Sequence, residues 1–299
     1  MNPWISAMRL RTLPLSIAGI ITGGAMAYND SKINFNSRLF VLAILTALLL
    51  QILSNFANDY GDFKNGADNE SRKGPQRAVQ SGAISAETMR IAIILFGILS
   101  LVSGLCLLYM AFAHINLLFI VYLCIGIGCI AAALKYTMGN NPYGYKGWGD
   151  FFVFLFFGLV SSSGIYFLLT LRLPMNVLLP SISIGAWSTA VLNLNNLRDI
   201  ENDKASGKIT IPVRLGKAKG LMYQSVLMVI PFIVNASYAL IKSNYTLLAF
   251  TCFTLLPAYI LFRPLLKNQD HETLDTSLKK TALFALLFTL SFVVGLCFN

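Results

Sequence analysis

Residues 55–77 read NFANDYGDFKNGADNESRKGPQR, and this stretch decides how the rest of the chain is interpreted. It follows an apolar run that ends near Leu53, so it lies where a hydrophobic helix would meet water. It contains Asp59, Asp62 and Asp68, and several basic residues follow them. Asp59 and Asp62 are three residues apart, so on a helix they would share one face. Two carboxylates on one face repel each other unless a cation lies between them. Magnesium suits that position, because it takes a few carboxylates and keeps sites for water or phosphate oxygens.

A second stretch repeats this pattern. Residues 195–216 read NNLRDIENDKASGKITIPVRLG, in which Asn196, Asp199 and Asp203 again follow an apolar run. Asp199 and Asp203 are four residues apart, which also places them on one helical face. Either cluster alone also fits a solvated helix end with scattered salt bridges. Two clusters of the same polarity predict two halves of one site, in which the basic residues would face a diphosphate.

The composition indicates a membrane protein. The chain of 299 residues is 56% hydrophobic and 12% charged, and a soluble domain would carry about twice that charged fraction. The net charge of +10 could suggest a nucleic-acid partner, but the basic residues gather in short loops between apolar runs, so no nucleic-acid binding is expected. The first apolar segment is expected to be retained and not cleaved as a signal peptide.

The apolar runs predict an all-α, polytopic bundle of about nine transmembrane helices in a single transmembrane domain, residues 1–299. Each run has the length of about 17–25 residues that a membrane crossing needs. The two acidic stretches end the second and sixth runs, which suggests possible duplicated four-helix units. The predicted spans are residues 12–28, 37–57, 88–110, 114–133, 149–169, 176–195, 219–241, 244–262 and 279–298.

The charges predict which side of the membrane carries the site. All but four of the 23 Lys and Arg residues fall on the side of the N-terminus, and the four exceptions are Lys32, Arg38, Arg172 and Lys242. Basic loops stay in the cytoplasm, so the N-terminus and both acidic clusters are expected there, at the inner membrane. The five cysteines all lie in apolar runs without a CxxC pair, which indicates buried apolar residues and not a disulfide framework.

Some polar residues outside the two clusters have two interpretations. Arg9 and Arg11 precede the first span and would either anchor it at the interface or recognise an acidic substrate. Lys135 and Tyr136 open a loop rich in tyrosine. Its rings would form an interfacial aromatic belt or a wall beside a carbocation, where cation–π attraction helps.

The constellation predicts chemistry on a lipid diphosphate. Magnesium ions on the two clusters would bind the diphosphate, while a long prenyl tail stays in the membrane. Metal and basic residues would stabilise the departing diphosphate, and an aromatic carbon would attack the allylic cation. An ion-coupled transporter is a rival class, but its polar groups would lie near the bilayer midplane. A purely structural membrane protein would not need paired acidic motifs.

At this point the sequence resembles the UbiA superfamily of intramembrane prenyltransferases. That family pairs a motif of the form NDxxDxxxD with one of the form DxxxD. Here the first is matched by Asn58, Asp59 and Asp62, and the second by Asp199 and Asp203. Asp68 lies six residues after Asp62 and not four, so its role as a direct ligand is in question.

The departure itself resembles one branch, the 1,4-dihydroxy-2-naphthoate polyprenyltransferases of menaquinone synthesis, whose first motif is similar to NDYxDxxxGxD. RLRTLP (residues 9–14), the loop PYGYKGWGD (142–150) and the second acidic stretch resemble the same branch. The resemblance implies magnesium-dependent transfer of a polyprenyl group to 1,4-dihydroxy-2-naphthoate with loss of its carboxylate, giving demethylmenaquinone. A relative that acts on another acceptor, such as 4-hydroxybenzoate, remains the nearest alternative.

The resemblance also implies roles for individual residues. One magnesium ion would be held by Asp59, Asp62 and Asp68, and the other by Asp199 and Asp203, with Asn58 and Asn196 orienting carboxylates or diphosphate. The other candidate substrate contacts are Arg72, Arg77, Lys208 and Arg214 for the diphosphate, Arg11 or Lys135 for the acceptor carboxylate, and Tyr136 and Asn55.

Overall fold

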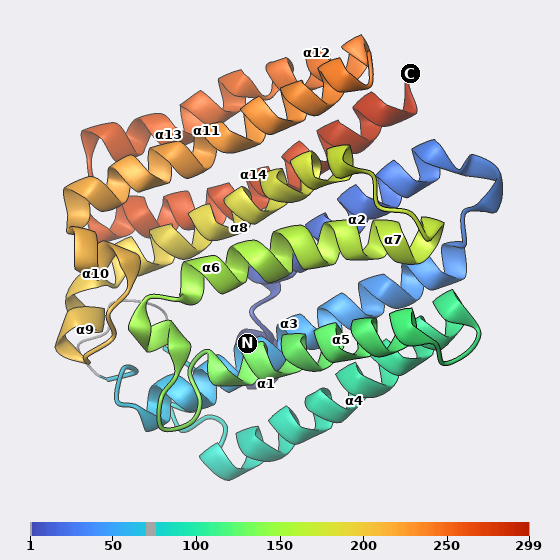
Figure 1. The fold of residues 1–299 in the computed structure, drawn as a ribbon. Coiled ribbons are helices and arrows are strands. Elements are labelled where there is room, and N and C mark those ends of the chain that lie inside the picture. Colours follow the sequence, from blue (N-terminus) through green and yellow to red (C-terminus); the bar gives the residue numbers. More distant parts are fainter. Residues whose placement is uncertain (1, 70–75, 299) are drawn as a thin grey trace.

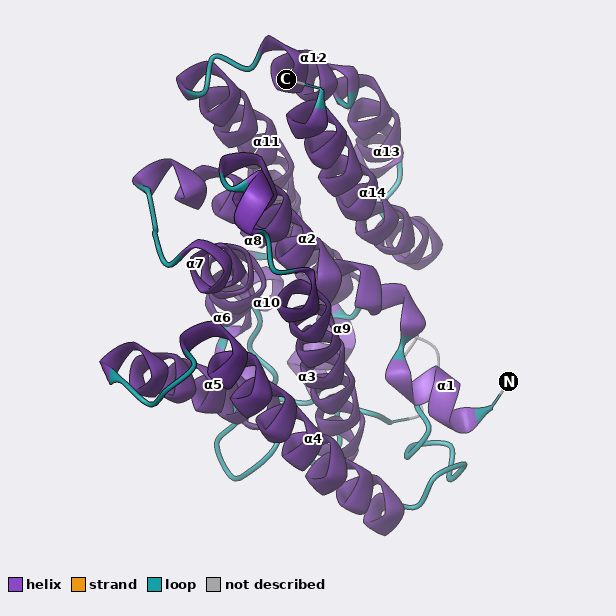
Figure 2. Cartoon of the chain, turned by 90° about the vertical axis from the view of Figure 1, so that its right-hand side faces the viewer, coloured by secondary structure: helices purple, strands orange, loops and turns teal. Residues whose placement is uncertain are grey.

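The structure, a computed structural model, describes residues 2–69 and 76–298. These residues form helices and loops and contain no strand (Figure 2). In chain order the elements are α1 (Pro3–Met8), η1 (Leu10–Thr12), α2 (Leu13–Asp30), η2 (Lys32–Asn34), α3 (Ser37–Lys64), α4 (Ala86–Phe112), α5 (Leu117–Lys135), η3 (Tyr143–Lys146), α6 (Gly149–Val153), η4 (Phe154–Ser163), α7 (Gly164–Thr170), η5 (Met175–Val177), α8 (Leu178–Arg198), α9 (Ile200–Ala205), α10 (Ile211–Leu215), α11 (Lys217–Ile241), α12 (Tyr245–Phe253), α13 (Leu255–Lys267) and α14 (His271–Cys297).

Eight described segments are long and apolar enough to cross a membrane, which confirms the expected all-α membrane bundle. They are α3, α4, α5, α6 to α7, η5 to α8, α11, α12 to α13, and α14. The ninth expected span, residues 12–28, forms α2, but this helix has only 18 residues and ends in the polar Asn29 and Asp30, which lowers its mean hydropathy. It packs inside the bundle against α14 and η4. Gly23 allows this close approach, because a Cβ there would lie 2.0 Å from the carbonyl oxygen of Ser162 on η4.

Two helix boundaries differ from the expected spans for local reasons. The second span continues beyond residue 57, so that α3 carries Asp59 and Asp62 in its last turns. The last span was expected to begin at residue 279, but α14 begins at His271. Asp270 is its N-cap, because the Asp270 Oδ1 atom accepts a hydrogen bond of 2.8 Å from the backbone N–H of Thr273.

The long helices run side by side, and the helix ends that carry the acidic clusters lie at one end of the bundle (Figure 1). The C-terminal ends of α3 and α8 lie at this end, next to α9, α10 and the loop before α6, whereas the C-terminus of the chain lies at the other end. Many large apolar side chains of α4 and α5 are exposed, as expected of helices that face lipid; examples are Ile91, Leu95, Val102, Ile120 and Val121. The duplication of a four-helix unit stays a prediction.

Candidate active site

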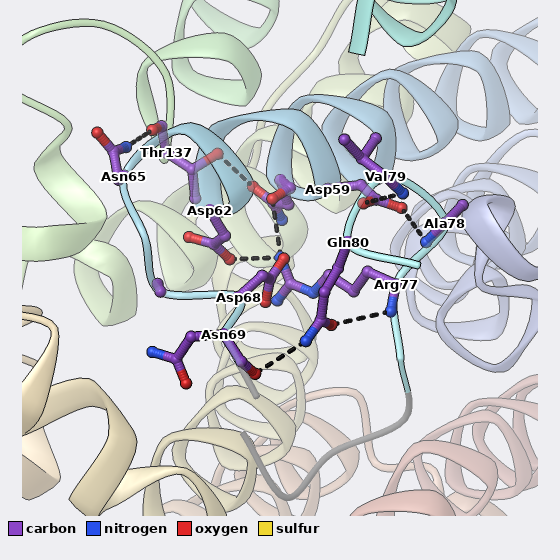
Figure 3. Close-up of polar contacts among 12 residues, drawn as sticks. Asp59, Asp62, Asn65, Asp68, Asn69, Arg77, Ala78, Val79, Gln80 and Thr137 are labelled. Atoms are coloured by element: carbon purple, nitrogen blue, oxygen red, sulfur yellow. Dashed lines mark hydrogen bonds and ion pairs between the residues drawn. The ribbon is translucent and has the colours of Figure 1, made fainter. Parts of the chain in front are cut away.

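The first acidic cluster is organised around Arg77. Asp62, on α3, is 2% exposed. Its Oδ2 atom accepts a hydrogen bond of 2.5 Å from Arg77 Nη1, and its Oδ1 atom accepts one of 2.8 Å from the hydroxyl of Tyr145. Arg77 Nη1 also donates to the carbonyl of Asn58 at 2.8 Å and lies 3.0 Å from a carboxylate oxygen of Asp68 (Figure 3). Burial lowers the pKa of Arg77, but Asp62 and Asp68 outweigh this effect and hold that pKa above its usual value.

Asp59 has a different environment from Asp62. It is 1% exposed, and its two carboxylate oxygens accept hydrogen bonds from the backbone N–H groups of Ala78, at 3.1 Å, and Val79, at 3.2 Å (Figure 3). The carboxylate therefore fixes the loop immediately after Arg77 onto α3. Through this loop, Asp59 positions the guanidinium that contacts Asp62 and Asp68.

A contact between α3 and the loop after α5 orients Asn58. The Thr137 hydroxyl lies 3.0 Å from the carbonyl of Ala57 and 3.2 Å from Oδ1 of Asn58, and both oxygens accept its hydrogen bond. The carbonyl of Thr137 accepts a bond of 2.7 Å from the side chain of Asn65 (Figure 3). Gly61 permits this contact, because a Cβ there would lie 2.5 Å from the Thr137 hydroxyl. The amide of Asn58 consequently directs its NH₂ group away from Thr137.

The second acidic cluster contains a buried arginine that the motif pattern did not single out. The guanidinium of Arg198 donates to both carboxylate oxygens of Asp199, with two distances of 2.8 Å. It also donates to Asp275 on α14 at 2.7 Å and to Oδ1 of Asn195 at 2.9 Å. Its side chain has no exposed area. Asp275 in turn lies 2.5 Å from the ammonium of Lys279. The last helix therefore contributes to the geometry of the second motif.

Asp203 and Asn196 offer oxygens that have no hydrogen-bond partner. Asp203 is 3% exposed and its Oδ1 atom lies 3.8 Å from Lys208 Nζ, while its Oδ2 atom is buried and accepts no hydrogen bond within the described part of the chain. The same is true of Oδ1 of Asn196. The pKa of Asp203 is raised to about 6, because burial and the charges of Asp199 and Asp62 together outweigh the lowering effect of Lys208. These are hard oxygen donors in a negatively charged environment.

The two clusters meet, as the sequence pattern predicted. The side chain of Asn202, on α9, donates a hydrogen bond of 2.9 Å to the carbonyl of Ala67, in the loop after α3. Lys208 lies between the clusters: burial lowers its pKa, but Asp62 and Asp203 raise it more, so that the pKa exceeds its usual value. The Lys208 ammonium also lies 5.5 Å from the ring centroid of Tyr145, whose hydroxyl binds Asp62. Residues from both halves of the chain therefore form one site.

This site opens into a cavity of about 580 Å³ whose remaining wall is mainly apolar. Asp62 and Ala43, both on α3, line it, and at 1.5 Å per residue they are about 28 Å apart along the helix. Polar residues line the end near the acidic clusters; they include Asn58, Asp62, Arg77, Tyr136, Asn195 and Lys208. The wall at the other end comes from α3, α4, α5 and α7 and includes Ala47, Leu108, Leu123, Gly126 and Leu168.

The other predicted residues are distributed as follows. Tyr136 and Asn55 line the cavity, and burial raises the pKa of Tyr136 to about 12. Lys135 is exposed and does not line it. Arg214 is also exposed and donates a hydrogen bond to the carbonyl of Lys146, so it holds the loop before α6. Arg72 and the side chain of Arg11 lie outside the described part of the structure.

The donor chemistry where the clusters meet fits magnesium. The buried Oδ2 of Asp203 and Oδ1 of Asn196 are hard oxygens left for a cation, and Asp62, which lines the polar end of the cavity, offers further carboxylate oxygens. Among the described residues, no three His, Cys, Asp or Glu side chains converge closely enough to hold a metal ion by themselves. Amide oxygens, water and diphosphate would complete the coordination, as is usual for this ion.

Three site residues were not predicted from the sequence. Thr137 and Arg198 have no motif of their own, although Arg198 lies inside the second acidic stretch. The rings of the loop that holds Tyr145 were expected at the site, but the hydrogen bond from Tyr145 to Asp62 was not. Asp275 is separated from that stretch by three helices. The sequence does offer one signal for the pair Arg198 and Asp275: an arginine at the end of a membrane span needs an acidic partner.

Comparison with known proteins places this chain in a family. The model of the UbiA prenyltransferase family matches residues 16–288. The 1,4-dihydroxy-2-naphthoate octaprenyltransferase of Haemophilus influenzae is 40% identical, over 98% of this chain and 95% of that protein. The protein of the same name from Escherichia coli K12 is 39% identical, over 98% of this chain and 94% of that protein.

Solved structures share the fold at low sequence identity. The apo structure of a UbiA homolog from Aeropyrum pernix K1 superposes with a TM-score of 0.71 at 15% identity, covering 96% of this chain and 98% of that one. A UbiA homolog from Archaeoglobus fulgidus, solved with GPP and Mg²⁺, gives a TM-score of 0.62 at 18% identity, covering 97% of this chain and 99% of that one. This chain is an integral, multi-pass membrane protein, and it belongs to the UbiA prenyltransferase family.

Proposed function

We propose that this protein transfers a polyprenyl group from a polyprenyl diphosphate to 1,4-dihydroxy-2-naphthoate in a magnesium-dependent reaction of menaquinone synthesis. The observation that carries this proposal is the polar end of a long apolar cavity, which Asp62, Arg77 and Lys208 line and where Lys208 lies 3.8 Å from Asp203 of the second motif. The relatives from H. influenzae and E. coli, at about 40% identity over nearly the whole chain, support the choice of acceptor.

The polar end fits the diphosphate group. Asp62, Asp203 and Asn196 would hold magnesium, with Asp199 fixed beside them by Arg198. Arg77 and Lys208 line the cavity there and carry positive charge, which suits contacts with phosphate oxygens. Magnesium, when bound, would neutralise the diphosphate and make it a better leaving group. The A. fulgidus homolog solved with GPP and Mg²⁺ supports the use of a divalent metal and a prenyl diphosphate.

The apolar end fits the prenyl tail. The cavity wall formed by α3, α4, α5 and α7 offers contacts to a hydrocarbon chain. Because the diphosphate is polar and the tail is not, each end of this substrate matches one end of the cavity.

The reaction breaks the bond between the diphosphate oxygen and the allylic carbon, and both electrons of this bond leave with the diphosphate. The electron-rich ring then forms a carbon–carbon bond to the allylic cation. The acceptor loses its carboxylate as CO₂, and the electron pair of the broken carbon–carbon bond stays on the ring, so that the product is the reduced form of demethylmenaquinone. Tyr136, Tyr143 and Phe152 line the cavity near its polar end, and such rings attract a cation.

We also propose that the site faces the cytoplasm, at the inner membrane in a bacterial cell. All but four of the 23 Lys and Arg residues lie on the side of the N-terminus in the predicted topology, and short basic loops are retained in the cytoplasm. The charge distribution supports this orientation because both acidic stretches share a side with most of these basic residues.

The test uses purified protein in detergent or lipid with a polyprenyl diphosphate. The acceptors 1,4-dihydroxy-2-naphthoate and 4-hydroxybenzoate are supplied in separate reactions, each with magnesium or with a chelator. Product from the naphthoate alone, and only with magnesium, is the expected result. Product from the benzoate alone would refute the proposed acceptor but would still support prenyl transfer as the reaction. No product from either acceptor, with a folded sample, would refute the whole proposal.

A further inference from the structure

The backbone just before α2 is held in an unfavourable conformation at Arg9. This residue has φ 50° and ψ 62°, in the left-handed region that side chains other than glycine rarely adopt. Such a conformation costs free energy and persists only where the surrounding structure enforces it. The observation prompts the question of what this geometry serves.

Polar side chains of α3 enforce the geometry from the cavity side. The side-chain NH₂ of Asn55 donates to the carbonyl of Met8 at 2.8 Å and to the hydroxyl of Thr12 at 3.3 Å. The Thr12 hydroxyl in turn donates to the carbonyl of Arg9 at 2.9 Å, and Gln51 donates to that hydroxyl at 3.2 Å. The carbonyl groups of Met8 and of Arg9 itself are therefore held by side chains that line the cavity.

This network forms a polar section in a mainly apolar wall. Arg9, Thr12, Gln51 and Asn55 all line the cavity. Asn55 precedes Asp62 by seven residues on α3, which is about 10 Å along the helix. The section therefore lies about two helical turns deeper in the cavity than the acidic cluster, close enough for an acceptor ring to be held beside the allylic carbon.

Arg9 is suited to bind an anion there. Three of the described Lys and Arg side chains line the cavity, namely Arg9, Arg77 and Lys208. Arg77 and Lys208 contact the acidic clusters, at Asp62 and Asp203 respectively, where the diphosphate would bind. The Nη2 atom of Arg9 is buried, which an arginine that only anchored a helix at the membrane surface would not require.

We propose that Arg9 binds the carboxylate of the aromatic acceptor, with Asn55 and Thr12 fixing its backbone for this purpose. The assignment rests on the proposed function, because it takes the acceptor to be an aromatic carboxylate. Of the two residues expected for this role, Lys135 is exposed and does not line the cavity. The side chain of Arg11 lies outside the described structure, so the expectation for Arg11 stays a prediction.

Because the backbone at Arg9 is left-handed, the test can separate the effect of losing the guanidinium charge from an effect on folding. Arg9→Gly removes the guanidinium, while glycine adopts this conformation without strain, so the variant is expected to fold, and its thermal unfolding is measured beside that of the wild type. Arg9→Asn is a second neutral variant that tolerates the same backbone, and Arg9→Lys keeps the charge. Lys135→Gln is the matched control, because it removes an exposed positive charge near the same end of the bundle.

The KM values for both substrates are measured, together with inhibition by 1-hydroxy-2-naphthoate and by 1-naphthol, which lacks the carboxylate. Loss of a buried charged contact predicts a rise of about 10- to 100-fold in the KM for the naphthoate in Arg9→Gly and Arg9→Asn. The KM for the prenyl diphosphate should stay near the wild-type value. Inhibition by the carboxylate should weaken by a similar factor and inhibition by naphthol should not, while Arg9→Lys shows a smaller rise and Lys135→Gln none.

Two outcomes separate the assignment from the proposed function. Suppose that the wild type prenylates the naphthoate. If the neutral Arg9 variants then have the wild-type KM for the naphthoate, or if inhibition by the carboxylate and by 1-naphthol weakens equally, the role of Arg9 is refuted and the proposed function stands. If the wild type forms no product from the naphthoate, the proposed function fails, and the assignment fails with it.

Discussion

Replacement of Asp59 by asparagine should release the loop that presents Arg77, and not primarily weaken metal binding. Both oxygens of Asp59 accept hydrogen bonds from the backbone N–H groups of Ala78 and Val79, at 3.1 Å and 3.2 Å. Asparagine keeps one acceptor and places an NH₂ group against the other N–H. The loss of one charge-assisted hydrogen bond, together with a buried donor left unpaired, should cost about 3 kcal/mol.

Limited trypsin digestion measures this effect, because trypsin cleaves after Arg77 when the loop opens. Where opening and closing are fast relative to cleavage, the cleavage rate follows the population of the open form. A cost of about 3 kcal/mol therefore predicts cleavage after Arg77 that is about 100-fold faster. Asp30→Asn is the matched control: this carboxylate accepts hydrogen bonds from Tyr166 and Lys242, outside the site, so its loss should not selectively expose Arg77.

The metal dependence of the variant provides the second measurement. The magnesium concentration that gives half-maximal activity should change little in Asp59→Asn, although the maximal rate falls because Arg77 is less well placed. A variant with wild-type cleavage after Arg77 and a much higher magnesium requirement would refute the reasoning, and it would identify Asp59 as a metal ligand.

Three further predictions concern the metal, α14 and the tail cavity. Chelation should abolish turnover and added Mg²⁺ should restore it, as a product assay before and after dialysis would show; activity that persists in the chelator would contradict a metal role. Asp275→Asn should leave Arg198 with one carboxylate fewer and lower the affinity for magnesium about 10-fold or more. A titration of activity with magnesium measures this affinity, and an unchanged titration would show that α14 does not influence the second motif. Gly126→Phe should favour shorter prenyl diphosphates, because Gly126 lines the cavity and a Cβ there meets no atom within 4 Å. Gly128→Phe is the control and should keep the wild-type preference, because Gly128 is equally open but does not line the cavity. Identical chain-length preferences for the two variants would refute the assignment of the apolar cavity to the prenyl tail.

The spacing of apolar runs and acidic residues was sufficient to predict the bundle and the meeting of the two motifs. Membrane-length runs constrain the fold strongly, because backbone groups in lipid must be satisfied within helices. Asp62 and Asp203 could be placed in one site because each follows a span that ends on the same side. The different roles of Asp59 and Asp62 could not be predicted from the spacing. The spacing shows that both lie on one helical face, but it does not show which group each carboxylate contacts.

Contacts between distant elements could not be read from the sequence. Asp275 reaches the second motif only through Arg198, and Thr137 reaches Asn58 only because Gly61 lets two backbones approach. Arg9 carried two interpretations in the sequence, and its position in the cavity wall favours substrate binding over anchoring at the interface.

The most direct test of the account is a double-mutant cycle on the binding of a prenyl diphosphate in the presence of magnesium. Wild type, Asp62→Asn, Asp203→Asn and the double variant are compared by calorimetry in detergent, with thermal unfolding as the check on folding. If both carboxylates serve one metal–diphosphate site, each single change should remove most of the magnesium-dependent affinity, and the double change should add little further loss. Losses in binding free energy that simply add would contradict a shared site, and with it the claim that two halves of the chain form one active centre.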